Sequence, residues 1–226
     1  MNLIDKLIKD EVLKTKEIIE SFRKIKRKDF LPESTDKKTL EDIAEVDEAL
    51  PIGYGQTISQ PLVVAFMLEL LKPQKGEKIL DVGAGSGWTS ALLAYIVSDN
   101  KRLKKGKVVA IEIVSKLKDF GEKNVSKYDF IKNGIVKFLC IDGSKGYKEE
   151  SPYDKILCSA SIYDENEKKT INKIPRKWKK QLKIGGKIVT PIDSSIWVFI
   201  KKSEDNFKSI EYPGFVFVPL VKKDEN

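Results

Sequence analysis

The stretch from Lys78 to Val97 most constrains how this chain folds, because it combines an apolar run, an acid and three alternate glycines. Residues 78–82 are rich in apolar and β-branched side chains, which predicts a buried strand, and residues 88–97 have the length and apolar content of a helix. The turn between them carries the three glycines, Gly83, Gly85 and Gly87. Because glycine lacks a Cβ, this turn can approach a ligand closely while the helix offers it free N–H groups. The stretch therefore predicts a site for a nucleotide-like cofactor.

The spacing of the glycines separates the cofactor classes. A dinucleotide fingerprint, G-x-G-x-x-G, needs a glycine at position 88, where this chain has Trp88. No Gly-Lys-Ser/Thr sequence closes the turn, which excludes a P-loop. The pattern therefore disfavours NAD, FAD and nucleoside triphosphates. A glycine turn that only lets a helix pack close to a sheet is the weaker explanation of the same residues.

A second acid, Glu112, follows the apolar run Val108–Ile111. A strand that ends near Asp81, a G-x-G-x-G turn and this later acid together resemble the class I S-adenosylmethionine-dependent methyltransferases. The resemblance implies that S-adenosylmethionine is the cofactor and that Glu112 receives its ribose hydroxyls. It also implies a doubly wound α/β fold, with a mostly parallel seven-stranded sheet and helices on both faces.

Periodicity and breaker residues predict the other elements. Two amphipathic helices open the chain, Thr15 caps the second, and the run Asp29–Pro32 ends it. Further helices are expected at 40–44, from Gln60–Pro61 onward, at 114–128 and at 177–182, where Gly185–Gly186 ends the last. The expected strands are 78–82, 108–111, 135–141, 154–160, 187–192, 196–202 and 215–220. We expect one domain, with a helical region at 1–50, a segment at 51–61, the sheet at 62–220 and a tail at 221–226.

The chain has 226 residues, enough for one domain with a sizeable core, and no apolar run approaches the roughly 20 residues that span a bilayer. Residues Met1–Lys9 mix charges among the apolar side chains, unlike a signal peptide. We expect a soluble, cytoplasmic monomer. Cys140 and Cys158 each lie in an apolar run, which favours buried, reduced thiols over a disulfide or a metal site.

The chain contains no histidine. This excludes Ser-His-Asp and Cys-His catalysis and removes the commonest zinc ligand, so we expect no metal. The 42 basic and 34 acidic residues give a net charge of +8, which suits an acidic partner or nucleic acid. The lysines are scattered, however, and the densest cluster, residues 101–107, falls in an expected loop. A solvated lysine-rich surface is the better explanation, and we expect no nucleic-acid partner.

Residues 50–61 carry the most specific motif, Leu-Pro-Ile-Gly-Tyr-Gly-Gln-Thr-Ile-Ser-Gln-Pro. This motif resembles the signature of the protein-L-isoaspartate O-methyltransferases, Leu-Pro-Ile-Gly-x-Gly-Gln-Thr-Ile-Ser-x-Pro. Other segments similar to that family occur in the expected order, and they are Arg27–Pro32, Ile141–Gly143, Pro152–Asp154, Gly185–Gly186 and Phe217–Leu220. The resemblance thus covers most of the chain.

The resemblance implies methyl transfer from S-adenosylmethionine to the free carboxylate of L-isoaspartyl residues in damaged proteins or peptides. The cofactor-binding residues that it implies are Gln56, Thr57, Ile58, Asp81, Gly83, Ala84, Gly85, Gly87, Glu112, Asp142 and Gly143. The substrate-binding residues that it implies are Ile52, Gly53, Thr57, Ser59 and Val218, with Ser59 as the catalytic residue that orients the acceptor. Gly53 and Gly55 make the segment a plausible lid over the cofactor.

Two of these residues have structural alternatives. Ser59, like Gln60, could cap the helix that starts at Pro61, and only the resemblance favours a functional role. Asp142 with Gly143 could form an ordinary turn. We favour the cofactor role for this pair because it follows a predicted strand, where open α/β sheets bind ligands.

The chain departs from the family on the acceptor side. Residues 159–164 lead into a longer charged stretch up to Ile174–Pro175, Asp193 stands where the family usually has glycine, and Leu62 stands where histidine or tyrosine is common. The alternatives are a methyltransferase for a specialised peptide or nucleic acid, and a non-catalytic binding protein. Amino-methyltransferases of nucleic acid carry Asn/Asp-Pro-Pro-aromatic where this chain has Cys158–Ser161, and the retained acids argue against lost cofactor binding.

Overall fold

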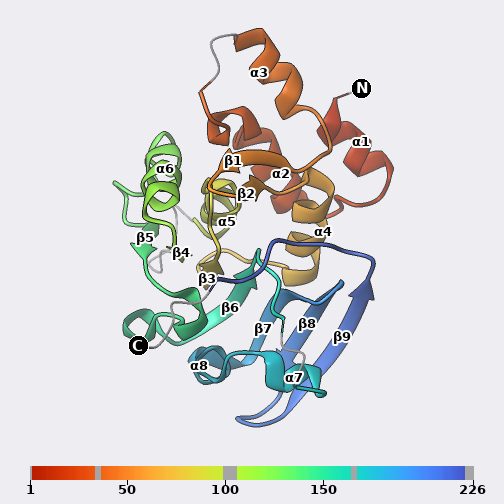
Figure 1. Cartoon of the computed structure of the whole chain (residues 1–226), viewed down its shortest axis with the longest axis vertical. Helices are drawn as coiled ribbons and strands as arrows, with labels where there is room; N and C mark the ends of the chain where they lie inside the picture. The colour runs from red at the N-terminus through yellow and green to blue at the C-terminus, as the bar shows by residue number, and fades with distance from the viewer. Residues whose placement is uncertain (1, 34–36, 99–105, 164–166, 222–226) are drawn as a thin grey trace.

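A computed structural model describes residues 2–33, 37–98, 106–163 and 167–221, and its centre is one twisted sheet (Figure 1). Seven strands form this sheet in the order β5-β4-β3-β6-β7-β8-β9. Their bounds are β3 (Lys78–Val82), β4 (Lys107–Glu112), β5 (Val136–Cys140), β6 (Tyr153–Cys158), β7 (Leu182–Ile192), β8 (Ser195–Lys201) and β9 (Phe207–Pro213). Two short strands, β1 (Leu50–Gly53) and β2 (Gln56–Ile58), form a separate antiparallel hairpin.

The helices of the described residues are α1 (Leu3–Lys9), α2 (Lys16–Lys24), α3 (Lys37–Ala44), α4 (Pro61–Leu71), α5 (Trp88–Val97), α6 (Ser115–Ser126), α7 (Thr170–Lys173) and α8 (Arg176–Gln181). Three 3₁₀ turns, η1 (Arg27–Phe30), η2 (Gly143–Lys145) and η3 (Lys148–Glu150), lie between them. The predicted strand at 78–82 and helix at 88–97 are confirmed to the residue. None of the described helices is long and apolar enough to cross a membrane.

Strands β5, β4, β3, β6 and β7 run parallel, and β8 and β9 add two antiparallel pairings at one edge. The chain leaves β3 toward β4 and β5, then returns to β6 on the other side of β3. This reversal places the carboxyl ends of β3, β4 and β6 around one crevice, where doubly wound sheets bind their ligands. The predicted doubly wound, seven-stranded sheet is therefore confirmed.

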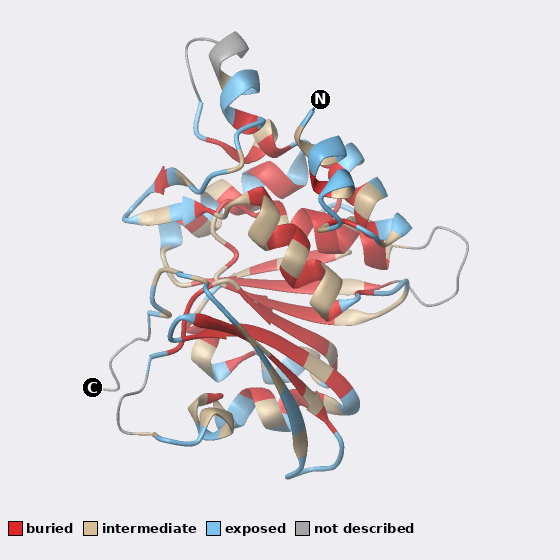
Figure 2. Cartoon of the chain, turned by 90° about the vertical axis from the view of Figure 1, so that its right-hand side faces the viewer, coloured by how far each residue is buried: buried red, intermediate tan, exposed pale blue. Residues whose placement is uncertain are grey.

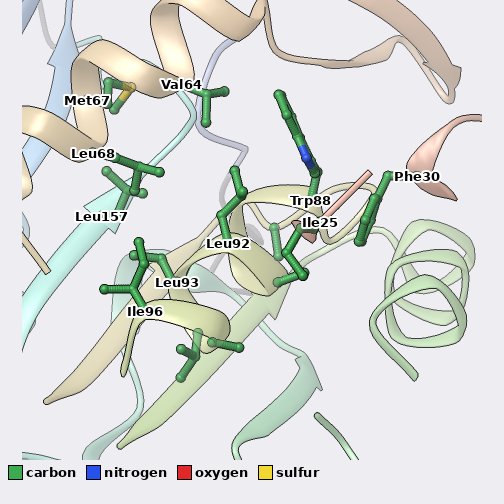
Figure 3. Packing of buried hydrophobic residues seen from close by; sticks show 14 of the residues in the cluster. Ile25, Phe30, Val64, Met67, Leu68, Trp88, Leu92, Leu93, Ile96 and Leu157 are labelled. Atoms are coloured by element: carbon green, nitrogen blue, oxygen red, sulfur yellow. The ribbon is translucent and has the colours of Figure 1, made fainter. Parts of the chain in front are cut away.

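The strands of the sheet are largely buried (Figure 2), and their alternating side chains contribute to two separate core clusters. Ile79 belongs to the cluster that includes α2, α4 and α5, whereas Leu80 and Val82 belong to the cluster around α8. Figure 3 shows Leu68 of α4 and Leu93 of α5 close to Leu157 of β6. The apolar side chains of β3 and β6 are buried on both sides, which is typical of a parallel sheet covered by helices.

The N-terminal helices and the hairpin gather at one end of the molecule (Figure 1). The two predicted amphipathic helices are confirmed as α1 and α2. Thr15 holds the N-cap position of α2, but its hydroxyl donates to Glu69 Oε2 at 2.7 Å instead of capping the helix. The second helix also ends earlier than predicted, at Lys24, because Ile25 adopts an extended backbone and the chain continues as η1.

Two predictions near the C-terminus are wrong. Gly185–Gly186 do not end a helix, because α8 already ends at Gln181 and both glycines lie inside β7. The pairing of β7 with β6 shifts at this point. Leu182 pairs with Tyr153 and Lys187 pairs with Lys155, so β7 has more residues than β6 between the two pairs. The glycines lie in the resulting irregularity of the strand.

The last strand of the sheet is β9 and not the predicted segment 215–220. After β9 the chain runs back across the molecule, as the blue trace in Figure 1 shows, and the β-bridge of 215–220 is the parallel one between Ser161 and Pro219. Phe215 and Phe217 pack against the core cluster, and Val218, Pro219 and Leu220 line the cavity described below, so the apolar residues of this segment do not reflect membership of the sheet.

Cys158 is buried and Cys140 is exposed, and both are free thiols. The prediction of burial is thus wrong for Cys140, which ends β5 where that strand emerges from the sheet. Of the lysine-rich cluster, residues 101–105 lie outside the described residues, and Lys107 begins β4 with its ammonium 2.5 Å from Glu150 Oε1. The tail at 222–226 also lies outside the described residues.

The turn before α5 generates a stability prediction. Gly87 has a φ of +85°, and a Cβ added there would lie 2.8 Å from the Gly121 carbonyl oxygen. Gly134 has a φ of +69° with open space around it, so it is the matched control. Gly134→Ala should cost roughly 1 to 2 kcal/mol of backbone strain, and Gly87→Ala should cost about 1 to 3 kcal/mol more because of overpacking. Urea unfolding measures both, and equal losses would contradict the account.

Candidate active site

A cavity of about 760 Å³, its open mouth included, lies at the carboxyl ends of β3, β4 and β6. Its wall is made by Gln56, Thr57, Ile58, Ser59, Val82, Gly83, Ala84, Gly85, Ser86, Trp88, Thr89, Ile111, Glu112, Ile113, Val114, Gly143, Ser159, Ala160, Val218, Pro219, Leu220 and Val221. Segments far apart in the sequence thus meet in one cavity.

The glycine turn forms the floor next to β3 and β4. The N–H groups of Gly83 and Ala84 both donate to the Ile111 carbonyl oxygen, at 2.9 and 3.0 Å. Gly85 has a φ of +52°, and its N–H donates to Glu112 Oε2 at 2.9 Å. Left-handed backbone of this kind favours glycine, which explains the alternate glycines of the sequence. The turn is therefore fastened to β4 by three backbone N–H groups.

Glu112 is the only lining residue with a charged side chain within the described part of the chain. Its carboxylate is held at both oxygens, because Oε1 accepts the Val114 N–H at 2.9 Å and Oε2 accepts the Gly85 N–H at 2.9 Å. The residue is 6% exposed. A largely buried acid without a basic partner in the wall gives the cavity a negative character.

A second acid, Asp81, lies just before the lining residue Val82 and is fully buried. Its Oδ2 accepts the Ser90 hydroxyl at 2.6 Å, and its Oδ1 has no partner among the described residues. Burial raises the pKa of Asp81 from 3.8 to about 7, the bond from Ser90 opposes this shift, and the charge of Glu112 adds to it. The protein thus holds a carboxyl group that the apo fold stabilises poorly in its charged form.

The hairpin of β1 and β2 covers the glycine turn. A Cβ added at Gly85 would lie 3.4 Å from Ile52 Cδ1, so the hairpin and the turn are in close contact. Gly53, Tyr54 and Gly55 all have a positive φ, at +92°, +56° and +70°, and they form the tip of the hairpin. Tyr54 is 62% exposed. The predicted lid segment is therefore an ordered hairpin whose second strand faces the cavity.

Ser59 lies between β2 and α4 and lines the cavity. The N-cap of α4 is Gln60, with no side-chain capping bond, and Pro61 occupies the first helical turn. Ser59 precedes the N-cap, so the alternative role as the capping residue is not supported by this geometry. Its carbonyl oxygen accepts a bond from Arg27 Nη2 at 3.3 Å.

Arg27 holds this region together, a role that its sequence context does not predict. Its guanidinium donates to the carbonyl oxygens of Val46 at 2.8 Å and Glu48 at 2.6 Å, besides that of Ser59. It also lies 5.5 Å from the ring centroid of Trp88. Burial lowers the pKa of Arg27 to about 10, and the nearby charge of Asp47 acts in the opposite direction. Arg27 thus joins the segment before the hairpin to the residue that follows it.

The opposite wall comes from the end of β6 and the C-terminal segment. Ser161 N–H donates to the Val218 carbonyl oxygen at 2.8 Å, and Leu220 N–H donates to the Ser161 carbonyl oxygen at 2.8 Å. Val218 and Leu220 both line the cavity. A short parallel pairing therefore places the returning C-terminal segment beside Ser161, just after the end of β6.

The structure brings most predicted site residues into one wall. Those that line the cavity are Gln56, Thr57, Ile58, Ser59, Gly83, Ala84, Gly85, Glu112, Gly143 and Val218, and those that do not are Ile52, Gly53, Asp81, Gly87 and Asp142. Asp142 is the N-cap of η2, where its Oδ1 accepts the Ser144 N–H at 2.9 Å. The turn-forming alternative thus describes the contacts that Asp142 makes.

Several lining residues have no place in the predicted site. They are Val82, Ser86, Trp88, Thr89, Ile111, Ile113, Val114, Ser159, Ala160 and the segment 219–221. For Ser159 a usable signal exists, because it follows β6, and residues after the central strands of an open sheet line its crevice. No comparable signal exists for residues 219–221. Their position depends on the pairing with Ser161, which is a contact between distant segments.

The comparisons with known proteins point in one direction. A family model described as protein-L-isoaspartate(D-aspartate) O-methyltransferase matches residues 1–225. A protein-L-isoaspartate O-methyltransferase of Methanopyrus kandleri is 36% identical, over 98% of this chain and 91% of that protein. One of Dictyoglomus thermophilum is 37% identical, over 95% of this chain and 87% of that protein.

Solved structures show the same fold. A protein-L-isoaspartate O-methyltransferase structure is similar with a TM-score of 0.78 at 27% identity, over 96% of this chain and 64% of that chain. A Plasmodium falciparum structure of this kind, in complex with S-adenosyl-L-homocysteine, has a TM-score of 0.80 at 22% identity, over 99% of this chain and all of that chain. The latter likeness concerns the fold alone.

The buried acid beside the cavity gives a pH-dependent prediction. The folded-state pKa of Asp81 is raised, so ionisation of its carboxyl group destabilises the folded protein. This destabilisation increases from about pH 4 to about pH 7. Asp81→Asn should therefore stabilise the apo protein at pH 8, by up to about 4 kcal/mol, and lose this advantage near pH 4. Urea unfolding of both proteins across this range tests it, and a difference that does not change with pH would contradict the assignment.

Proposed function

Since the chain belongs to the protein-L-isoaspartate O-methyltransferase family, we propose that it transfers a methyl group from S-adenosylmethionine to the free carboxylate of L-isoaspartyl residues in proteins or peptides. One observation carries the proposal. The signature segment, through Gln56–Ser59, and the glycine turn, through Gly83–Ser86, line the same cavity although they are far apart in the sequence. Together they form a site with a cofactor side and an acceptor side.

The residues present fit S-adenosylmethionine. The cavity is lined by one charged side chain, that of Glu112, and a second acid, Asp81, lies directly behind the wall with an unpartnered oxygen. Trp88 also lines the cavity, and its Nε1 is buried without a partner among the described residues. A negative cavity with orphaned polar atoms suits a ligand that carries a positive charge and hydrogen-bonding groups.

The cofactor side is formed by the turn, by Glu112 and by Gly143. Glu112 accepts backbone bonds at both oxygens and keeps further lone pairs, so it can accept ribose hydroxyls without rearrangement. The turn exposes backbone rather than side chain, which lets the ligand approach closely. Gly143 lines the cavity beyond Glu112 and is assigned to the adenine end.

The acceptor side is formed by Ser59 and by the segment that includes Val218. When bound, S-adenosylmethionine supplies a methyl group on a positively charged sulfur, and its transfer to a carboxylate oxygen cancels one charge of each sign. A carboxylate is already ionised at neutral pH, so no residue has to remove a proton, in agreement with a chain that has no histidine. Ser59 therefore orients the acceptor, and the walls exclude water. Holding the reacting atoms in near-attack geometry can supply roughly 7 to 11 kcal/mol.

The acceptor assignment predicts steep discrimination between isomers. The protein should methylate a peptide with one L-isoaspartyl residue and leave the same peptide with normal aspartate unmodified, because a displacement of about 1 Å can cost on the order of a hundredfold in rate. Transfer of labelled methyl groups to the two matched peptides measures this. Equal labelling of both peptides, or labelling of RNA or DNA in place of either, would overturn the proposal.

The role of Ser59 can be separated from a role in the start of α4. Ser59→Ala should lower turnover of the isoaspartyl peptide roughly tenfold or more. The variant should lose less stability than the loss of an N-cap causes, which is typically about 1 kcal/mol. Ser126→Ala is the matched control, because the Ser126 hydroxyl bonds only to its own helix, at the Glu122 carbonyl oxygen. Steady-state kinetics and thermal melts of both variants test this assignment. Retained turnover together with lost stability in Ser59→Ala would refute the acceptor role.

A further inference from the structure

Asp193 stands in the turn between β7 and β8 with a φ of +53°. Left-handed backbone is unfavourable for a residue with a side chain, and glycine would occupy the position without strain. The chain nevertheless carries an acid here. A strained backbone conformation persists where the surrounding contacts hold it in place. The contacts of Asp193 therefore indicate what holds this residue.

Asp193 bonds to two segments that are distant in the chain. Its Oδ2 lies 2.8 Å from Lys173 Nζ, at the end of α7. Its backbone N–H donates to the Ile162 carbonyl oxygen at 3.3 Å, and its carbonyl oxygen accepts the Ser161 hydroxyl at 3.2 Å. One residue therefore connects α7 to Ser161–Ile162.

Ser161 carries this connection to the cavity. The residue is fully buried, and its backbone pairs with the Val218 carbonyl oxygen and the Leu220 N–H, both at 2.8 Å. Val218 and Leu220 line the cavity on the acceptor side. An uninterrupted series of polar contacts thus runs from the Lys173 ammonium through Asp193 and Ser161 to the acceptor wall.

The ion pair between Lys173 and Asp193 fixes the position of the two residues and contributes little to the free energy of unfolding. The Asp193 side chain is 54% exposed and the Lys173 side chain 11% exposed. A pair with one partner this exposed contributes little to the free energy of unfolding. The neighbouring Ile174 is fully buried in the cluster around α8, so the backbone that carries Lys173 is anchored independently of the pair.

We infer that Lys173 and Asp193 are positioning residues for the acceptor: their ion pair holds Ser161 and the Val218–Leu220 wall in place and thereby sets the Michaelis constant for the isoaspartyl peptide. This inference rests on the proposed function for its kinetic consequence. The cofactor side, which is built on Glu112 and the glycine turn, shares none of these contacts. Loss of the pair should therefore affect the peptide and not the cofactor.

The test compares Asp193→Gly, Lys173→Met and the double variant with the wild type. Asp193→Gly removes the carboxylate and relieves the backbone strain together, whereas Lys173→Met removes the ion pair alone, so a shared effect of the two variants belongs to the ion pair. Each variant should raise KM for the isoaspartyl peptide about fivefold, and the double variant should raise it no further. The kcat and the cofactor affinity should stay near wild type. The melting temperature should stay near wild type in Lys173→Met and should not fall in Asp193→Gly, where the backbone strain is relieved. Lys173→Arg should retain the wild-type KM.

Two control variants match these changes away from the cavity. Asp129→Gly relieves the same strain, at a φ of +56°, and Lys118→Met removes the 2.6 Å pair with Glu122 on α6. Neither should change KM. An unchanged KM in Asp193→Gly, or single-variant effects that multiply in the double variant, would overturn the inference.

Hydrogen exchange provides a readout that does not depend on activity. The Ser161 and Leu220 amides should exchange faster in Asp193→Gly and Lys173→Met than in the wild type and the two controls, since their bonds depend on the position of Ser161. Unchanged exchange would overturn the positioning role. If the wild type fails to methylate the peptide while exchange responds as expected, the proposed function fails and the structural role of the pair stands.

Discussion

The carboxylate of Glu112 accepts one backbone N–H at each oxygen, from Gly85 at 2.9 Å and from Val114 at 2.9 Å, and the geometry of the site depends on these two bonds. The first bond fixes the turn that leaves β3, and the second fixes the chain that leaves β4 toward α6. One acid thus joins the ends of two neighbouring strands. Hydrogen bonds to a carboxylate are among the stronger ones, so the two bonds hold the side chain and both strand ends in position before any ligand arrives.

The two sides of the cavity are held by different kinds of interaction. The cofactor side is built from short segments that directly follow β3 and β4, and its geometry comes from local backbone conformation. The acceptor side is built from distant segments, which Arg27 joins through the carbonyl oxygens of Glu48 and Ser59 and which Ser161 joins through its pairing with Val218. A buried guanidinium and an isolated bridge outside the named strands therefore hold the wall that we assign to the acceptor.

This division also explains what could be predicted from the sequence. The apolar run 78–82 and the glycines after it predict both the strand and the turn that lines the cavity, because strand and turn are consecutive in the sequence. The segment 215–220 has a similar apolar pattern yet forms no sheet strand, since its partner is Ser161 and the contact gives no periodic signal. Arg27 is likewise one basic residue among 42, and only its contacts with the carbonyl oxygens of Glu48 and Ser59 distinguish it. Long-range contacts leave no mark on the local pattern.

The central claim is that one cavity, organised by Glu112, binds the methyl donor beside the acceptor wall. A crystal structure of the protein with S-adenosyl-L-homocysteine tests it most directly. The account predicts that the ligand lies between the glycine turn and the hairpin, with its ribose hydroxyls bonded to the Glu112 carboxylate and its sulfur directed toward Ser59. A ligand bound outside this cavity, or inside it without contact to Glu112, would contradict the account.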